Sequence, residues 1–137
     1  MSSQPPPVPR RKILIVDDDA VIVGTISLKL KGKGYQILTA SDGSEAVKVV
    51  RKENPDLIVL DITFPPDVSG VPWDGFRIME WVHHMDEAQR IPVIIISGSD
   101  PEKYKGRSEE IGAAAYFQKP VDHDELMEVI DRTLQEA

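Results

Sequence analysis

The chain of 137 residues contains no cysteine, which excludes disulfides, thiolate zinc sites and a cysteine nucleophile. It also lacks an apolar run of roughly 18 residues, the length that crosses a bilayer, and an N-terminal secretory signal. Basic residues are outnumbered, 16 against 23 acids, and the net charge of −7 argues against binding to nucleic-acid phosphates. These absences predict a cytoplasmic protein that binds neither membranes nor nucleic acids, and they favour cations or basic protein surfaces as partners.

The remaining composition is that of one folded domain. Hydrophobic residues make up 41% and charged residues 28% of the chain, both ordinary values for a globular protein. Residues 1–11 are polar and rich in proline, so they cannot contribute to a core and are predicted to form a disordered tail. We therefore expect a tail over 1–11 and a single domain over 12–137.

Short β-branched runs alternate with amphipathic segments along this domain. The runs predict strands covered on both faces at residues 13–16, 35–39, 57–60, 93–96 and 114–118. Apolar residues at helical spacing predict intervening helices around residues 22–30, 46–50, 76–82 and 126–134. A further helix over 101–111 is predicted more weakly, since little of it is apolar. Five such βα units indicate an α/β fold with an open parallel sheet between two layers of helices.

In a fold of this kind the functional site lies at the carboxyl ends of the strands. The residues predicted there are Asp17, Asp18, Asp19, Asp61, Ser97 and Lys119. Clustered carboxylates repel one another unless a cation is present, and Mg²⁺ prefers carboxylate, carbonyl and water oxygens. A lysine and a hydroxyl beside such an ion could bind phosphoryl oxygens. The set therefore predicts a phosphoryl-transfer site.

Four motifs in this order, ILIVDDD, DLIVLD, IIIS and YFQKP, resemble those of the receiver domains of two-component response regulators. The resemblance covers residues 12–136 and is to the stand-alone type, similar to the chemotaxis regulator. It implies a flavodoxin-like, doubly wound (βα)5 fold with a five-stranded parallel sheet in the order 2-1-3-4-5. It also implies a signalling domain that catalyses only its own phosphorylation and dephosphorylation.

The resemblance assigns a role to each candidate residue. The implied roles are phosphoacceptor for Asp61, phosphate binding for Lys119, switching for Ser97 and Tyr116, and Mg²⁺ binding for Asp17 (through water), Asp18, Asp61 and Thr63 (through its carbonyl). The implied donor is a phosphohistidine on a sensor histidine kinase or histidine phosphotransfer protein. Since the sequence ends with the last predicted helix, we expect output through contact with a downstream target protein or through onward phosphotransfer.

Two alternatives from other classes stay open. The run Asp17-Asp18-Asp19-Ala20-Val21 also fits the DxDxV pattern of haloacid-dehalogenase-type phosphatases, in which Asp17 would be the nucleophile. The other alternative is a receiver-like interaction module that does not accept phosphate. The Asp-Gly pair that follows the nucleophile in receivers comes late here, at Asp74-Gly75, so the loop 65–75 is longer than in the family. This loop either contacts a partner through Trp73 or is a tolerated surface insertion.

Smaller motifs have structural interpretations. Asp19, Asp42 and Asp122 are predicted to cap helices, the last two with a glutamate three residues later. Gly32-Lys33-Gly34 follows a predicted helix and is expected to end it rather than to bind phosphate. His83 and His84 are expected on different faces of one helix, as surface or packing residues.

Overall fold

The computed structural model describes residues 11–17, 19–61, 91–97, 113–119 and 121–136. Its elements are β1 (Lys12–Val16), α1 (Ala20–Gly32), β2 (Gln36–Ala40), α2 (Gly43–Glu53), β3 (Leu57–Asp61), β4 (Val93–Ser97), β5 (Ala115–Gln118) and α5 (His123–Glu136). All five predicted strands are confirmed to within one residue at each end. The helices predicted around 76–82 and 101–111, the loop 65–75 and residues 1–10 lie outside the described residues.

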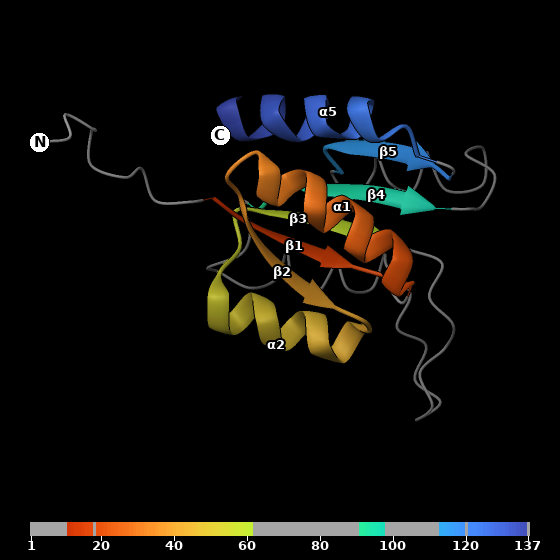
Figure 1. Cartoon of the computed structure of the whole chain (residues 1–137). Helices are drawn as coiled ribbons and strands as arrows, with labels where there is room; N and C mark the ends of the chain where they lie inside the picture. Colours follow the sequence, from red (N-terminus) through yellow and green to blue (C-terminus); the bar gives the residue numbers. More distant parts are fainter. Residues whose placement is uncertain (1–10, 18, 62–90, 98–112, 120, 137) are drawn as a thin grey trace, which may run out of the picture.

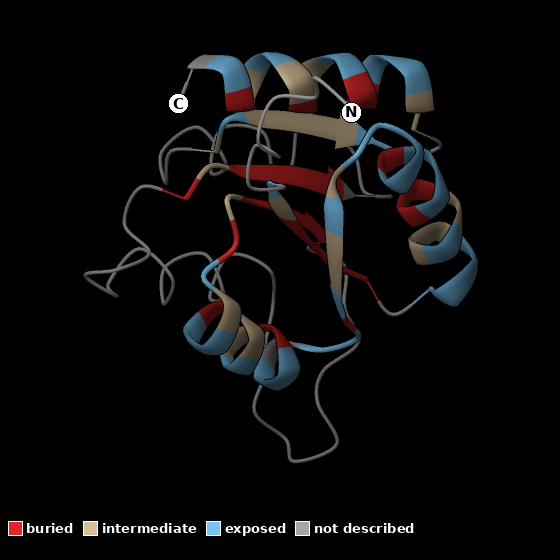
Figure 2. Ribbon diagram, turned by 60° about the vertical axis from the view of Figure 1, so that its left-hand side comes forward, coloured by how far each residue is buried: buried red, intermediate tan, exposed pale blue. Residues whose placement is uncertain are grey.

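The five strands form one parallel sheet in the order β2-β1-β3-β4-β5, as the resemblance implied. Helices α1 and α5 cover one face of this sheet and α2 lies against the other (Figures 1 and 2). Strand β3 is central, with β1 on one side and β4 on the other. The carboxyl ends of these three strands therefore meet at one edge, where the sequence predicts the site.

Alternating side chains of each strand feed two separate cores. In β1, Ile13 and Ile15 pack with α1 and α5, whereas Leu14 and Val16 pack on the α2 side, and all four are at most 1% exposed. This two-sided burial explains why the strands read as continuous apolar runs rather than as alternating patterns. Truncating one such side chain to alanine would cost about 2–5 kcal/mol.

The helices begin and end where local side-chain chemistry requires. Asp19 Oδ1 accepts hydrogen bonds from the amides of Val21 (2.9 Å) and Ile22 (3.4 Å), so its predicted role as the cap of α1 is confirmed. The cap roles of Asp42 and Asp122 are confirmed in the same way. Beyond the end of α1, Gly34 has φ +94°, a left-handed conformation that glycine adopts without strain.

No helix among the described residues is long and apolar enough to cross a membrane.

Candidate functional site

Asp17 and Asp61 lie side by side at the carboxyl edge of the sheet. Strands β1 and β3 pair in the register Val16↔Leu60, so the next residue of each strand is an aspartate. Asp17 is 5% exposed and Asp61 2% exposed, which is unusual for acidic residues. The parallel register thus brings together two of the acids that the sequence predicted at strand ends.

Lys119 reaches these acids from the end of β5, two strands away from β3. Its Nζ lies 2.9 Å from Asp61 Oδ2, a hydrogen-bonded ion pair, and 3.5 Å from Asp17 Oδ2. The lysine side chain is 23% exposed, so the ammonium belongs to the buried cluster without being sealed from solvent. The predicted convergence of Asp17, Asp61 and Lys119 is present in the structure.

The backbone fixes the orientation of Asp17. The amide of Asp19 donates a hydrogen bond of 2.9 Å to Asp17 Oδ1, while the amide of Asp17 itself donates to the carbonyl of Ala40 at 3.1 Å. One carboxylate oxygen therefore faces the start of α1 and the other faces Lys119. Asp19 therefore caps α1 with its side chain and orients the carboxylate of Asp17 with its backbone amide. The sequence pattern did not reveal this second contact.

Burial, more than the excess of negative charge, sets the electrostatics of this cluster. Burial raises the pKa of Asp17 to about 6, and the nearby Asp61 adds to this, while the Asp19 amide and Lys119 oppose it. Burial by itself lowers the pKa of Lys119, but the hydrogen bond and charge of Asp61, together with Asp17, raise it above its usual value. One ammonium thus serves two buried carboxylates, and a cation would relieve their mutual repulsion.

This donor set fits Mg²⁺. Buried carboxylate oxygens carrying more negative charge than Lys119 offsets are what a hard divalent ion requires. Asp18 and Thr63, the other predicted ligands, lie outside the described residues. Within the described part of the chain no group of three histidine, aspartate or glutamate side chains is placed to hold a metal ion.

The two predicted switch residues belong to neighbouring strands. Ser97 is the last residue of β4 and pairs with Gln118 of β5, one position beyond the pair Asp61↔Ile96. Tyr116 packs against the core on the α2 side, and its hydroxyl is buried without a hydrogen-bond partner among the described residues. The structure therefore places Ser97 on the strand next to that of Asp61 and Tyr116 one strand further away, and it does not bring Tyr116 into the acidic cluster.

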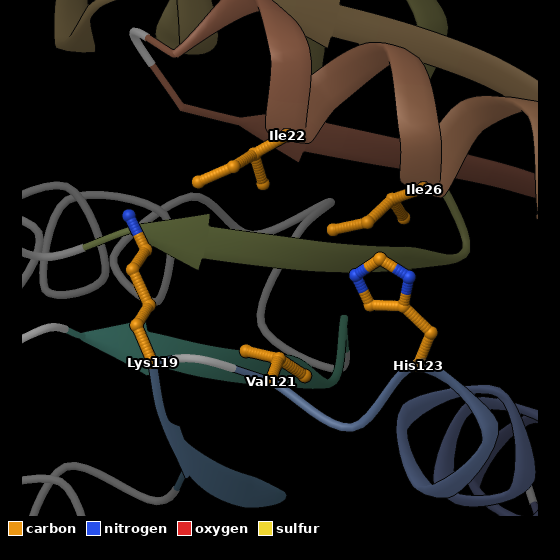
Figure 3. A pocket seen from close by; sticks show the side chains of 5 residues that line it. All are labelled: Ile22, Ile26, Lys119, Val121 and His123. Atoms are coloured by element: carbon orange, nitrogen blue, oxygen red, sulfur yellow. The ribbon is translucent and has the colours of Figure 1, made fainter.

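A pocket of about 440 Å³ opens beside Lys119, between α1 and the segment that joins β5 to α5 (Figure 3). Its described lining is Ile22, Ile26, Lys119, Val121 and His123. Ile22 and Ile26 belong to the apolar spacing that predicts the helix around residues 22–30, whereas no sequence motif indicates Val121 or His123. Val121 and His123 follow Lys119 closely in the sequence, but only the structure shows that they line a pocket beside the site.

Comparisons with known proteins agree with this geometry. Residues 13–131 match the family model of the response regulator receiver domain. The chain is 34% identical over 123 residues to the protein PilH of Pseudomonas aeruginosa, a match that spans 90% of this chain and 97% of PilH. It is 35% identical over 116 residues to PhoP of Bacillus subtilis, an alkaline phosphatase synthesis transcriptional regulatory protein, of which the match spans 45%.

Solved structures show the same fold. A CheY-like receiver domain protein of Methanospirillum hungatei superposes with a TM-score of 0.82 at 28% identity, covering 93% of this chain and 95% of that one. The chemotaxis response regulator CheY4 of Vibrio cholerae gives a TM-score of 0.78 at 28% identity, with 90% and 98% of the two chains covered. These matches favour a signalling domain over a dedicated enzyme. The chain belongs to the response regulator receiver domain family of two-component signalling.

Proposed function

We propose that this receiver domain accepts a phosphoryl group on Asp61 from a phosphohistidine of a sensor histidine kinase or histidine phosphotransfer protein. The observation that carries the proposal is the buried contact of 2.9 Å between Lys119 Nζ and Asp61 Oδ2, beside Asp17. A nucleophilic carboxylate, a fixed ammonium and a second acid at one sheet edge supply positioning and charge neutralisation. Those are the main requirements of phosphoryl transfer.

In the transfer, a carboxylate oxygen of Asp61 forms a bond to phosphorus while the bond from phosphorus to the imidazole nitrogen breaks. The electron pair of the broken bond stays on the imidazole, which takes up a proton from solvent and leaves as neutral histidine. Lys119 remains protonated throughout, in agreement with its raised pKa, and stabilises the charge on a phosphoryl oxygen.

Mg²⁺ is the cofactor that the residues fit. Asp18, Asp61 and the carbonyl of Thr63 would bind it directly and Asp17 through water. When bound, the ion supplies positive charge for the acids and for the phosphoryl oxygens. The support in this chain is the pair of buried carboxylates that share one lysine and the raised pKa of Asp17.

Phosphorylation would add about −1.5 to −2 charges at the end of β3. Ser97 would donate a hydrogen bond to the new group, and Tyr116 would rotate inward. Tyr116 is suited to follow Ser97, because it lies on the neighbouring strand β5 and packs against the core on the α2 side. The output would be a change in a partner-binding surface that includes β5 and α5, read by a downstream protein.

The test is to incubate the full chain with acetyl phosphate and Mg²⁺ and then to measure the mass of the intact protein by mass spectrometry. The wild type should gain one phosphoryl group, and Asp61→Asn should gain none. Asp42→Asn is the matched control, since it changes a carboxylate at a helix cap where asparagine also caps well. Circular dichroism of both variants checks that they are folded.

Other outcomes identify the alternatives. Equal labelling of Asp61→Asn and wild type would contradict the proposal. Turnover of phosphate esters that survives Asp61→Asn but is lost in Asp17→Asn would indicate a dehalogenase-type phosphatase. A folded wild type that binds neither Mg²⁺ nor phosphoryl group would instead be a receiver-like interaction module.

A further inference from the structure

The outward face of α1 lacks the charged surface that normally covers an exposed helix. From Ala20 through Leu28 no residue of the sequence is charged. Val21 is 76% exposed and Leu28 74% exposed, and among the described residues these are the exposed large hydrophobic side chains. Figure 2 shows the exposed residues of α1 on the side turned away from the sheet. Exposed apolar side chains grouped on one uncharged helix face are a feature that a protein contact can use.

The exposed apolar residues form one stripe. Val21, Gly24 and Leu28 follow each other at spacings of three and four residues, so they lie on one side of the helix, opposite the buried Ile26 and Leu30. At Gly24, an added Cβ would have no heavy atom within 4 Å. The middle of the stripe is therefore low and open, and another helix could approach it closely.

The stripe is complementary to itself. If two copies of α1 packed antiparallel about an axis beside Gly24 and Thr25, Val21 of each copy would face Leu28 of the other. The charges at its ends also match under this operation: Asp19 stands at the N-terminal end, and Lys29 and Lys31 lie in the last turn. Each acidic end would then lie opposite the basic end of the other copy, with the two helix dipoles antiparallel.

We propose that the stripe Val21–Gly24–Leu28 is an isologous contact through which two copies of this chain pair by their α1 helices. A single pair of helices buries less surface than a standard stable interface, so the pairing is expected to be weak and dependent on concentration. It uses the outward face of α1 and not the pocket beside Lys119, which is lined by Ile22 and Ile26 on another side of the same helix.

Analytical ultracentrifugation of the full chain at protein concentrations up to about 1 mM tests the proposed pairing. This range of concentration is high enough to populate a weak dimer. The weight-average mass should rise toward that of a dimer at moderate salt, where the repulsion between two chains of net charge −7 is screened. The double variant V21S/L28Q should remain monomeric. Glu128→Gln, which changes an exposed position on α5, should associate like the wild type. Both altered apolar residues are largely exposed, so the fold should be retained.

Cross-linking gives a second measurement, because the chain has no cysteine of its own. Gly24→Cys, at the centre of the stripe, should form a disulfide-linked dimer several-fold faster than Lys48→Cys on the exposed side of α2. Equal rates for the two variants, together with a monomer at all concentrations, would overturn the proposal. A monomeric wild type whose V21S/L28Q form is phosphorylated normally by acetyl phosphate but slowly by a phosphohistidine donor would assign the stripe to the donor instead.

Discussion

Two clusters that join a lysine to aspartate lie near the two ends of α1, and they differ in the balance of charge. Near the N-terminal end, the ammonium of Lys119 contacts two buried carboxylates, those of Asp17 and Asp61. Near the C-terminal end, Asp131 of α5 accepts hydrogen bonds from both Lys33 and the hydroxyl of Tyr35. In the first cluster two carboxylates contact one ammonium, whereas in the second one carboxylate contacts one ammonium and one hydroxyl.

The pKa values follow this difference. Burial raises the pKa of Asp17 to about 6, and Asp61 beside it adds to the rise. Burial would also raise the pKa of Asp131, but the hydrogen bonds from Lys33 and Tyr35 outweigh it and lower that pKa below its usual value. The second cluster links the turn between α1 and β2 to α5 by hydrogen bonds that favour the charged carboxylate. In the first cluster, burial and the neighbouring carboxylate disfavour the charged form of Asp17, as in a site prepared for a cation or a phosphoryl group.

The largest difference between the two clusters is expected when Lys119 and Lys33 are each replaced by methionine and the free energies of unfolding are compared. In divalent-free buffer at pH 8, Lys119→Met should lower the free energy of unfolding by about 3 kcal/mol, because it leaves two buried carboxylates without their ammonium. Lys33→Met should cost less than about 1 kcal/mol, since this pair is about one-third exposed. Urea unfolding at pH 8 and pH 5 measures both. The cost of Lys119→Met should shrink at pH 5, where Asp17 is protonated. A cost that is equal for the two lysines would contradict the distinction.

Much of this fold could be predicted from the sequence, because each strand is buried on both faces and therefore stands out as a continuous apolar run. Val93 to Ile96 is such a run, and it occupies the predicted position. The weaker signal of residues 35–39 came from an edge strand, where burial is incomplete, and that strand begins and ends one residue later than predicted. Element boundaries depend on backbone pairing between distant segments, which a linear pattern does not contain.

The site was predictable to the same extent and for a related reason. The carboxyl ends of parallel strands must lie at one edge, so the meeting of Asp17, Asp61 and Lys119 follows from topology. The partners of Asp131 did not follow, since Lys33 and Tyr35 reach α5 across nearly the whole sequence. The sequence around Val21 and Leu28 is visibly uncharged, but helical spacing alone predicts that such apolar residues are buried in the core. It therefore did not predict the outward stripe of α1.

Neutralising Asp17 should stabilise the metal-free protein. Its folded-state pKa of about 6 lies above its unfolded value, so its contribution to stability is complete below about pH 4 and is lost as the pH rises through 6. Asp17→Asn should therefore match the wild type near pH 4 and exceed its free energy of unfolding by about 1–2 kcal/mol at pH 8. Urea titrations without divalent ions measure this, with Asp42→Asn as the control. Added Mg²⁺ should narrow the difference by stabilising the wild type more, and a variant less stable than wild type at pH 8 would reverse the assigned sign.

Neutralising Asp131 should have the opposite sign and the smallest effect. Because the folded-state pKa of Asp131 is lowered, its stabilising contribution is present above about pH 4 and is lost as the pH falls through the folded value. Asp131→Asn should cost less than about 1 kcal/mol at pH 7, discounted for exposure, and nothing at acidic pH. Urea unfolding across this range measures it.

Tyr35 provides an internal reporter for the same variant. Burial raises the pKa of Tyr35 to about 12, and the hydrogen bond to Asp131 adds to the rise. An ultraviolet titration of Asp131→Asn should show one tyrosine whose pKa has moved down toward 10, and Tyr35→Phe should lack that transition altogether. If the titration were unchanged while stability fell, Asp131 would act through Lys33 alone. The second cluster would then be a plain ion pair, and its contrast with the first cluster would rest on the number of carboxylates at each lysine alone.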